Sequence, residues 1–108
     1  MSLYQLRVYS LASRESLDFY KDVVYPRHLD GYFPKAGVRA HGFWTVPDDQ
    51  QHRLFVLVSM DESTDTAEVE RTFMQDPDFL ADVRGLDPSM ILGVEATDLT
   101  PTTRSPLQ

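Results

Sequence analysis

Cysteine is absent from these 108 residues, and glycine occupies only five positions. Without cysteine the chain cannot form disulfides, thiolate nucleophiles, cysteine zinc sites or iron–sulfur clusters. The few glycines form no loop of the kind that cradles phosphates. No apolar run approaches the roughly 20 residues of a membrane span, and the N-terminus has no signal-peptide pattern. We therefore expect a cytoplasmic protein with no membrane partner.

Basic residues are also scarce, because ten lysines and arginines stand against 17 acidic residues and give a formal net charge of -7. Such a surface repels a phosphate backbone, so nucleic acid is not an expected partner. The three histidines, His28, His41 and His52, lie on separate predicted elements and lack the spacing of metal sites. We expect neither a metal nor a cofactor, although a lone histidine leaves haem binding open.

The length is that of a single domain, which buries roughly 65% of its unfolded surface and needs no disulfide or metal to fold. We expect this domain to span residues 1–99. Residues 100–108 are rich in threonine, proline and serine and have little to bury, which predicts a flexible C-terminal tail.

Four segments have the alternating pattern of β-strands: 3–11, 37–46, 53–60 and 89–99. In the second segment, strict alternation places Trp44 with Val38 and Ala40 on the core side, and His41 with Phe43 on the other side. The third segment is apolar on both faces, which is typical of a strand buried on both sides.

Helices are predicted between the first two strands and between the last two. Ser13 or Ser16 caps the first helix, and Pro26 should make it kink or restart because proline lacks an N–H. Gly37, with the preceding Pro34, ends it.

The second helix should begin at an Asp65–Glu68 capping arrangement and restart at Asp76–Pro77. Gly85 should end it.

The resulting βαββαβ order predicts an α+β, ferredoxin-like fold, with a four-stranded antiparallel sheet in the order 4-1-3-2 and two helices on one face. The aliphatic positions should meet the helices: Leu6, Val8, Val56, Val58, Leu92 and Val94. The other face then collects a mixed set: Gln5, Arg7, Tyr9, Arg39, His41, Phe43, Phe55, Leu57, Ser59, Ile91, Glu95 and Thr97. This face is too apolar for water, so a second copy should cover it in a homodimer.

Three short runs resemble the NIPSNAP family of the dimeric α+β barrel superfamily. They are Tyr-Gln-Leu-Arg-Val-Tyr at 4–9, Gly-Phe-Trp-Thr at 42–45 and Asp-Pro-Asp-Phe at 76–79. The resemblance covers residue 3 to about residue 99 and implies a homodimer whose sheets close into a barrel. It implies no reaction, because the family lacks an agreed activity. The wider superfamily is similar in fold to cofactor-free monooxygenases, haem-degrading oxygenases, isomerases and polyketide cyclases, so the fold does not decide the function.

On the predicted open face, Arg7 and Glu95 lie on adjacent strands. They form a structural ion pair, or Arg7 anchors a carboxylate or enolate ligand. His41 on the same face acts as a general base, or is satisfied by its neighbours or the dimer partner. Tyr9 and Tyr32 orient a ligand through their hydroxyls, or only pack.

Two functions follow from these alternatives. In the first, which we favour, the chain is a homodimer that binds a small ligand in the barrel, with Tyr9, Tyr32, Phe43 and Glu95 as ligand-binding residues. In the second it is a cofactor-independent monooxygenase or isomerase acting on an aromatic or polyketide-like substrate. His41 is then the base, and Arg7 stabilises the negative charge that develops.

Overall fold

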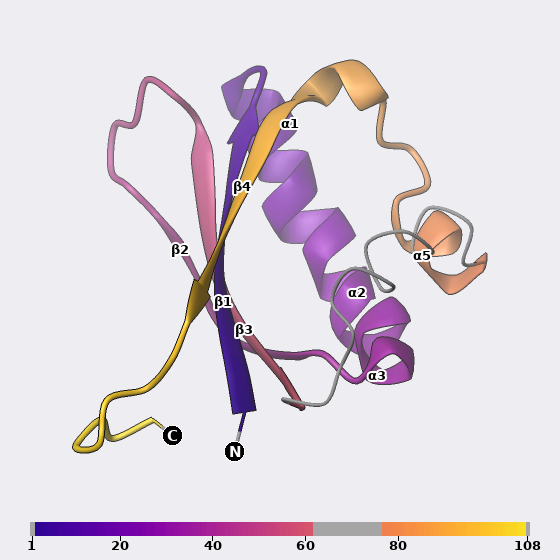
Figure 1. The fold of residues 1–108 in the computed structure, drawn as a ribbon. Helices are drawn as coiled ribbons and strands as arrows, with labels where there is room; N and C mark the ends of the chain where they lie inside the picture. Colours follow the sequence, from indigo (N-terminus) through magenta and orange to yellow (C-terminus); the bar gives the residue numbers. More distant parts are fainter. Residues whose placement is uncertain (1, 62–76, 108) are drawn as a thin grey trace.

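A computed structural model of the chain describes residues 2–61 and 77–107. Within these ranges, one layer of helices packs against one face of a twisted sheet (Figure 1). The elements in chain order are β1 (Ser2–Leu11), α1 (Arg14–Phe19), a π-helical segment (Tyr20–Val24), α2 (Tyr25–Asp30), α3 (Tyr32–Ala36), β2 (Arg39–Thr45), β3 (Arg53–Asp61), α5 (Pro77–Asp82), a 3-10 turn (Pro88–Met90) and β4 (Ile91–Leu99).

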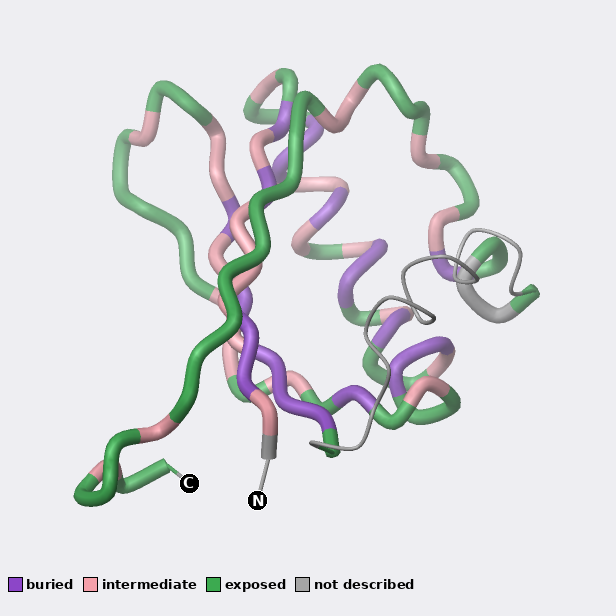
Figure 2. Tube along the Cα trace, in the orientation of Figure 1, coloured by how far each residue is buried: buried purple, intermediate pink, exposed green. Residues whose placement is uncertain are grey.

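The sheet is antiparallel with the order β2-β3-β1-β4, which confirms the predicted 4-1-3-2 arrangement and the ferredoxin-like α+β fold. β1 and β3 lie at its centre. Helices α1 to α3 cover one face, and no described element covers the other, which we call the open face (Figure 1). Buried backbone is concentrated where β1 and β3 meet the helices, whereas β4 is exposed along nearly its whole length (Figure 2).

The predicted helix boundaries hold where the structure describes them. Ser13 is the N-cap of α1, and its Oγ accepts a hydrogen bond from the Ser16 N–H at 3.1 Å. The helix changes character just before Pro26, which stands in the first turn of α2 after the π-helical segment. Gly37 closes α3 with a φ of 73°, in the left-handed region that glycine adopts easily.

In the second helical region, α5 begins at Pro77, and Gly85 follows its end with a φ of 92°. The Asp65–Glu68 cap and Asp76 lie outside the described residues.

The first strand faces the opposite way from the prediction. Arg7 pairs with Val56 and Tyr9 with Leu54, so the polar side of β1 shares the helix side with the buried valines of β3. Leu6 and Val8 lie on the open face instead. A one-residue difference in register exchanges the two faces of a strand, and the alternation of β1 alone does not decide between them.

The second strand contains a β-bulge that exchanges its faces midway. The register with β3 shifts between Ala40 and Gly42, so Phe43 pairs with Val56 on the helix side. Trp44 lies on the open face, where 53% of its surface is exposed. The predicted core position of Trp44 and the predicted open-face position of Phe43 are therefore both wrong, because a bulge breaks strict alternation.

A second irregularity displaces the start of β4. Leu11 pairs with Ile91 but Ser10 pairs with Gly93, which leaves Leu92 as the extra residue. Ile91 packs against the core, while Leu92 and Val94 are 71% and 51% exposed. The predicted place of Leu92 against the helices is therefore wrong, because the extra residue breaks the alternation. Val94 pairs with Tyr9 and keeps the predicted side, but it stays exposed because β4 is an edge strand.

Candidate functional site

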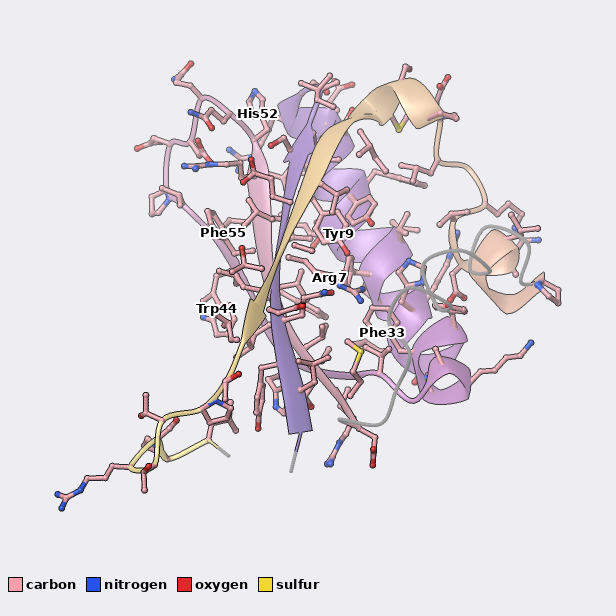
Figure 3. The ribbon with its side chains drawn as sticks, in the orientation of Figure 1. Arg7, Tyr9, Phe33, Trp44, His52 and Phe55 are labelled. Carbon is pink, nitrogen blue, oxygen red and sulfur yellow. The ribbon has the colours of Figure 1, made fainter. Side chains whose placement is uncertain are left out.

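A group of polar side chains lies between β1 and the helices, where a small domain usually buries apolar residues. We call it the inner polar cluster, and its members are Gln5, Arg7, Tyr9, Tyr20, Tyr25, His28 and Asp82. Strand β1, the helical layer and the end of α5 each contribute to it. Arg7 and Tyr9 point from β1 toward the helices, and Trp44 and Phe55 point away on the open face (Figure 3).

Three tyrosines form the first part of the cluster. The hydroxyls of Tyr9 and Tyr25 are hydrogen-bonded at 2.5 Å, and the rings of Tyr9, Tyr20 and Tyr25 lie 5.1–5.4 Å from one another. Burial, and then the neighbouring Tyr9, raises the pKa of both Tyr20 and Tyr25 far above the ordinary value. These phenols are neutral near pH 7, so they supply O–H donors rather than negative charge.

The π-helical segment explains how Tyr20 and Tyr25 come to share one face. Residues five apart on a regular α-helix point about 140° away from each other. Here the Tyr25 N–H bonds to the carbonyl oxygen of Tyr20, and this wider turn brings both rings against Tyr9. Such π turns occur often at functional sites.

Arg7 is the cation of the cluster. Its Nε donates a hydrogen bond of 2.7 Å to Oε1 of Gln5, whose amide in turn donates to Oδ1 of Asp98 at 3.0 Å. The hydroxyls of Tyr9 and Tyr25 lie against the guanidinium. No carboxylate among the described residues forms an ion pair with Arg7.

The expected pairing of Arg7 with Glu95 is not formed. Arg7 pairs across the strands with Ala96, and Glu95 pairs with Val8 on the open face. The two charged side chains therefore extend from opposite faces of the sheet, because β1 faces the opposite way from the prediction.

His28 and Asp82 complete the cluster. Nδ1 of His28 lies 2.9 Å from Oδ2 of Asp82, which also accepts the backbone N–H of Tyr32 at 2.9 Å. Burial, and also the charge of Arg7, lowers the pKa of His28 despite the opposing influence of Asp82. The imidazole is therefore neutral near pH 7, with Nδ1–H donated to Asp82 and Nε2 as the basic nitrogen.

Gly31 makes this contact possible. A Cβ atom at position 31 would lie 2.4 Å from Oδ1 and 2.7 Å from Oδ2 of Asp82. Arg27 holds the same region from the other side, since its Nη1 donates to the carbonyl oxygens of Asp82 and Arg84 at 3.3 and 2.8 Å. The end of α5 is thereby fixed on α2 and α3.

The structure divides the predicted site residues between the two faces. Arg7 and Tyr9 belong to the inner polar cluster, the ring of Phe43 lies 5.0 Å from that of Tyr25, and buried Tyr32 stands beside His28.

His41 lies on the open face with Glu95. Its Nε2 is 2.6 Å from Oγ of Ser59, and its ring is 5.4 Å from that of Tyr4. Within one subunit the sheet separates His41 from Arg7, so the two predicted catalytic residues do not meet.

Sequence reasoning missed His28, Asp82, Tyr20 and Tyr25 as site residues. His28 and Asp82 are 54 positions apart, and no local pattern joins them. The five-residue spacing of the tyrosines just before Pro26 was the available signal, since proline favours an irregular turn there.

A separate surface hollow of about 230 Å³ lies between α1 and the β2–β3 connection. Its arginine and its lysine are already paired: Arg14 with Asp18 at 3.3 Å, and Lys21 with Asp22 at 2.9 Å. Among residues 2–61 and 77–107, no cluster of three or more histidine or acidic side chains has the arrangement of a metal site. No helix in the same ranges has the length and apolar character needed to cross a membrane.

Comparisons with known proteins agree on the fold. The sequence profile of the NIPSNAP family matches residues 4–106. A NIPSNAP family protein from Agrobacterium tumefaciens is similar in structure, with a TM-score of 0.72 and 19% identity over 100% of both chains. No curated protein sequence matches this chain.

Two more distant structures share the fold. A protein from Nitrosomonas europaea, named as a candidate antibiotic biosynthesis monooxygenase, has a TM-score of 0.62 and 12% identity over 95% of this chain and 93% of its own. A dimeric ferredoxin-like protein from an uncultured marine organism has a TM-score of 0.53 and 13% identity over 96% of this chain and 93% of its own. Identities this low show a likeness of fold alone.

Proposed function

The chain belongs to the NIPSNAP family, and on that premise we propose that it acts as a homodimer that binds a small molecule in the inner polar cluster of each subunit. The observation that carries the binding function is the polar character of this interior. Burying a charge or a hydroxyl costs free energy that hydrogen bonds only partly offset, and apolar side chains of similar volume often give equal or greater stability. A cluster of this kind is therefore better explained by binding than by folding.

The open face supports the dimer. Leu6, Val8, Phe55 and Leu57 lie on it, and Trp44 is 53% exposed there. A contiguous apolar surface of this kind marks an interaction site, and a two-fold axis allows the same surface to cover itself. The marine ferredoxin-like protein with this fold is described as dimeric. The cytoplasmic location stays a prediction from the sequence.

Two measurements test this function. Light scattering at micromolar concentration should give twice the chain mass of 12.4 kDa, and a monomer would contradict the dimer. A thermal-shift screen should then find compounds that raise the melting temperature, since a ligand that binds only the folded state stabilises it by mass action. The screen contains aromatic acids, phenols, flavins and haem. If no compound raises the melting temperature, binding of a protein partner becomes the better proposal for the function.

The second candidate is a cofactor-independent monooxygenase or isomerase. Its specific support is the His28–Asp82 contact beside Arg7, which provides a neutral base of fixed tautomer next to a cation. The fold of the Nitrosomonas europaea protein agrees with this candidate. His28 then takes the role that the sequence suggested for His41, because His41 lies on the other face. Oxygen uptake or isomerisation of a compound that binds, lost in His28→Gln while binding remains, would favour the enzyme.

A further inference from the structure

The inner polar cluster contains more hydrogen-bond donors than acceptors around Arg7. A guanidinium carries five N–H donors and no acceptor, and Gln5 receives the one on Nε. Of the other four donors, two have acceptors in the hydroxyls of Tyr9 and Tyr25, which are the other side-chain oxygens beside the guanidinium. These hydroxyls already share a hydrogen bond with each other, and the Tyr20 hydroxyl adds a further O–H next to Tyr9.

The positive charge of Arg7 is also not balanced by a carboxylate of the described residues. The buried carboxylate of Asp82 is engaged by His28 and by the backbone N–H of Tyr32 rather than by Arg7. Glu95 is on the other face, and Asp98 accepts from the Gln5 amide. A partly buried cation with neutral neighbours gains most from an anion that supplies two acceptor oxygens, because arginine binds carboxylates through two parallel hydrogen bonds.

The surroundings of this cation are flat and aromatic. The Tyr25 ring lies 5.0 Å from Phe43 and 5.6 Å from Phe33, and Phe33 stacks on His28 at 5.2 Å. Rings at these distances are in contact with one another, and together they give the cluster a flat aromatic wall beside the Tyr25 hydroxyl. A neutral His28 adds no second positive charge, so the attraction for an anion centres on Arg7.

We propose that Arg7, with the hydroxyls of Tyr9 and Tyr25, is the anchor for the carboxylate or enolate of a small planar organic anion. This inference rests on the proposed small-molecule binding and names its ligand class. The sequence suggested an anion in the barrel between the two sheets of a dimer. The site proposed here lies instead in the interior of each subunit. The anionic group lies against the guanidinium fork, and the planar body of the ligand lies against the wall that the aromatic rings form.

Benzoate and benzamide provide the test, because they have nearly the same shape and differ in charge. Titrations of both compounds, at constant chloride and without other organic anions, should show benzoate binding at least about tenfold more tightly, since a hydrogen bond to a charged group is the stronger kind. Arg7→Met should abolish this preference. Arg7→Lys should retain part of it, because lysine keeps the charge and loses the planar fork. Arg14→Met is the matched control, since Arg14 is exposed on α1 and pairs with Asp18.

The outcomes separate this inference from the proposed function. Equal binding of the two compounds, or a benzoate preference that survives in folded Arg7→Met, overturns the anion site and leaves small-molecule binding in place. Failure of every charged and neutral compound in the screen overturns both. If Arg7→Met does not fold, nitrogen-15 spectra of the wild type give the answer. The Arg7 Nε–H signal, identified by its absence from Arg7→Lys, should move with benzoate and not with benzamide, and a signal that benzoate leaves in place overturns the proposal.

Discussion

Replacing Gly31 by alanine should break the contact that fixes α5 on the helical layer. The new Cβ would lie 2.4 Å from Oδ1 of Asp82, whereas ordinary contacts of this kind begin near 3.4 Å. Asp82 must therefore retreat by about 1 Å. The backbone cannot move instead, because the Cβ would also meet the Arg27 carbonyl oxygen at 2.9 Å, and that oxygen accepts the Gly31 N–H.

The size of the effect follows from the bonds that are lost. Oδ2 of Asp82 accepts from Nδ1 of His28 and from the Tyr32 N–H, both at 2.9 Å, and neither bond survives such a shift. Hydrogen bonds to charged groups contribute about 1.5–3 kcal/mol each. The lower flexibility of alanine in the unfolded chain offsets about 0.4–1 kcal/mol. We expect Gly31→Ala to lower the free energy of unfolding by about 2–5 kcal/mol, which for a domain of this size corresponds to a drop of about 10 °C or more in melting temperature.

Thermal and urea unfolding at fixed protein concentration measure this change. Gly93→Ala is the matched control, because nothing lies within 4 Å of a Cβ at position 93, and it should melt close to the wild type. A double-mutant cycle identifies the cause. In an Asp82→Ala background most of the cost of Gly31→Ala should disappear, since the clashing carboxylate is gone. A Gly31→Ala protein that melts within about 2 °C of the wild type, or costs that simply add in the double mutant, would refute this account of α5.

Three further changes have defined outcomes. The pKa of His28 is lowered in the folded state by burial, with Arg7 acting in the same direction and Asp82 opposing it. The unfolded chain therefore binds a proton first as the pH falls through about 6.5, and stability should decrease below that pH by at most about 1.4 kcal/mol per pH unit. Urea unfolding at a series of pH values should show that His28→Gln has lost this part of the pH dependence. An unchanged dependence of the unfolding free energy on pH would contradict the assignment to His28. Tyr9→Phe removes the 2.5 Å hydrogen bond to Tyr25 and an acceptor beside Arg7, so unfolding experiments should show a loss of about 1–3 kcal/mol. Trp44→Lys places a charge on the open face and should raise the dimer dissociation constant more than tenfold in light scattering, with an unchanged circular dichroism spectrum. A dimer unaffected by this charge would place the subunit contact elsewhere.

Local chemistry in the sequence predicted the elements well and their faces less well. Ser13, Pro26 and Gly37 each act within a few residues of themselves, so their effects on the first helix followed from capping, a missing N–H and a left-handed conformation. The register of β1 against β3 depends on pairing between segments about 50 positions apart, and the bulge between Ala40 and Gly42 adds one residue to β2. Neither leaves a local signal, so the sides of Arg7 and Trp44 could not be predicted from alternation.

The two faces of β1 are the reverse of what the burial of apolar side chains would give. Leu6 and Val8 are the aliphatic pair of the strand, yet they lie on the open face, while Gln5, Arg7 and Tyr9 lie under the helices. In an isolated subunit this arrangement exposes apolar surface and buries polar groups, which opposes folding on both counts. A second copy over the open face removes the first cost, because Leu6 and Val8 then enter a core shared by two sheets. An anion on Arg7 reduces the second cost. The proposed dimer and the proposed ligand would therefore account for opposite faces of the same strand. Ligand binding should then survive in a monomeric Trp44→Lys variant if the subunit folds alone.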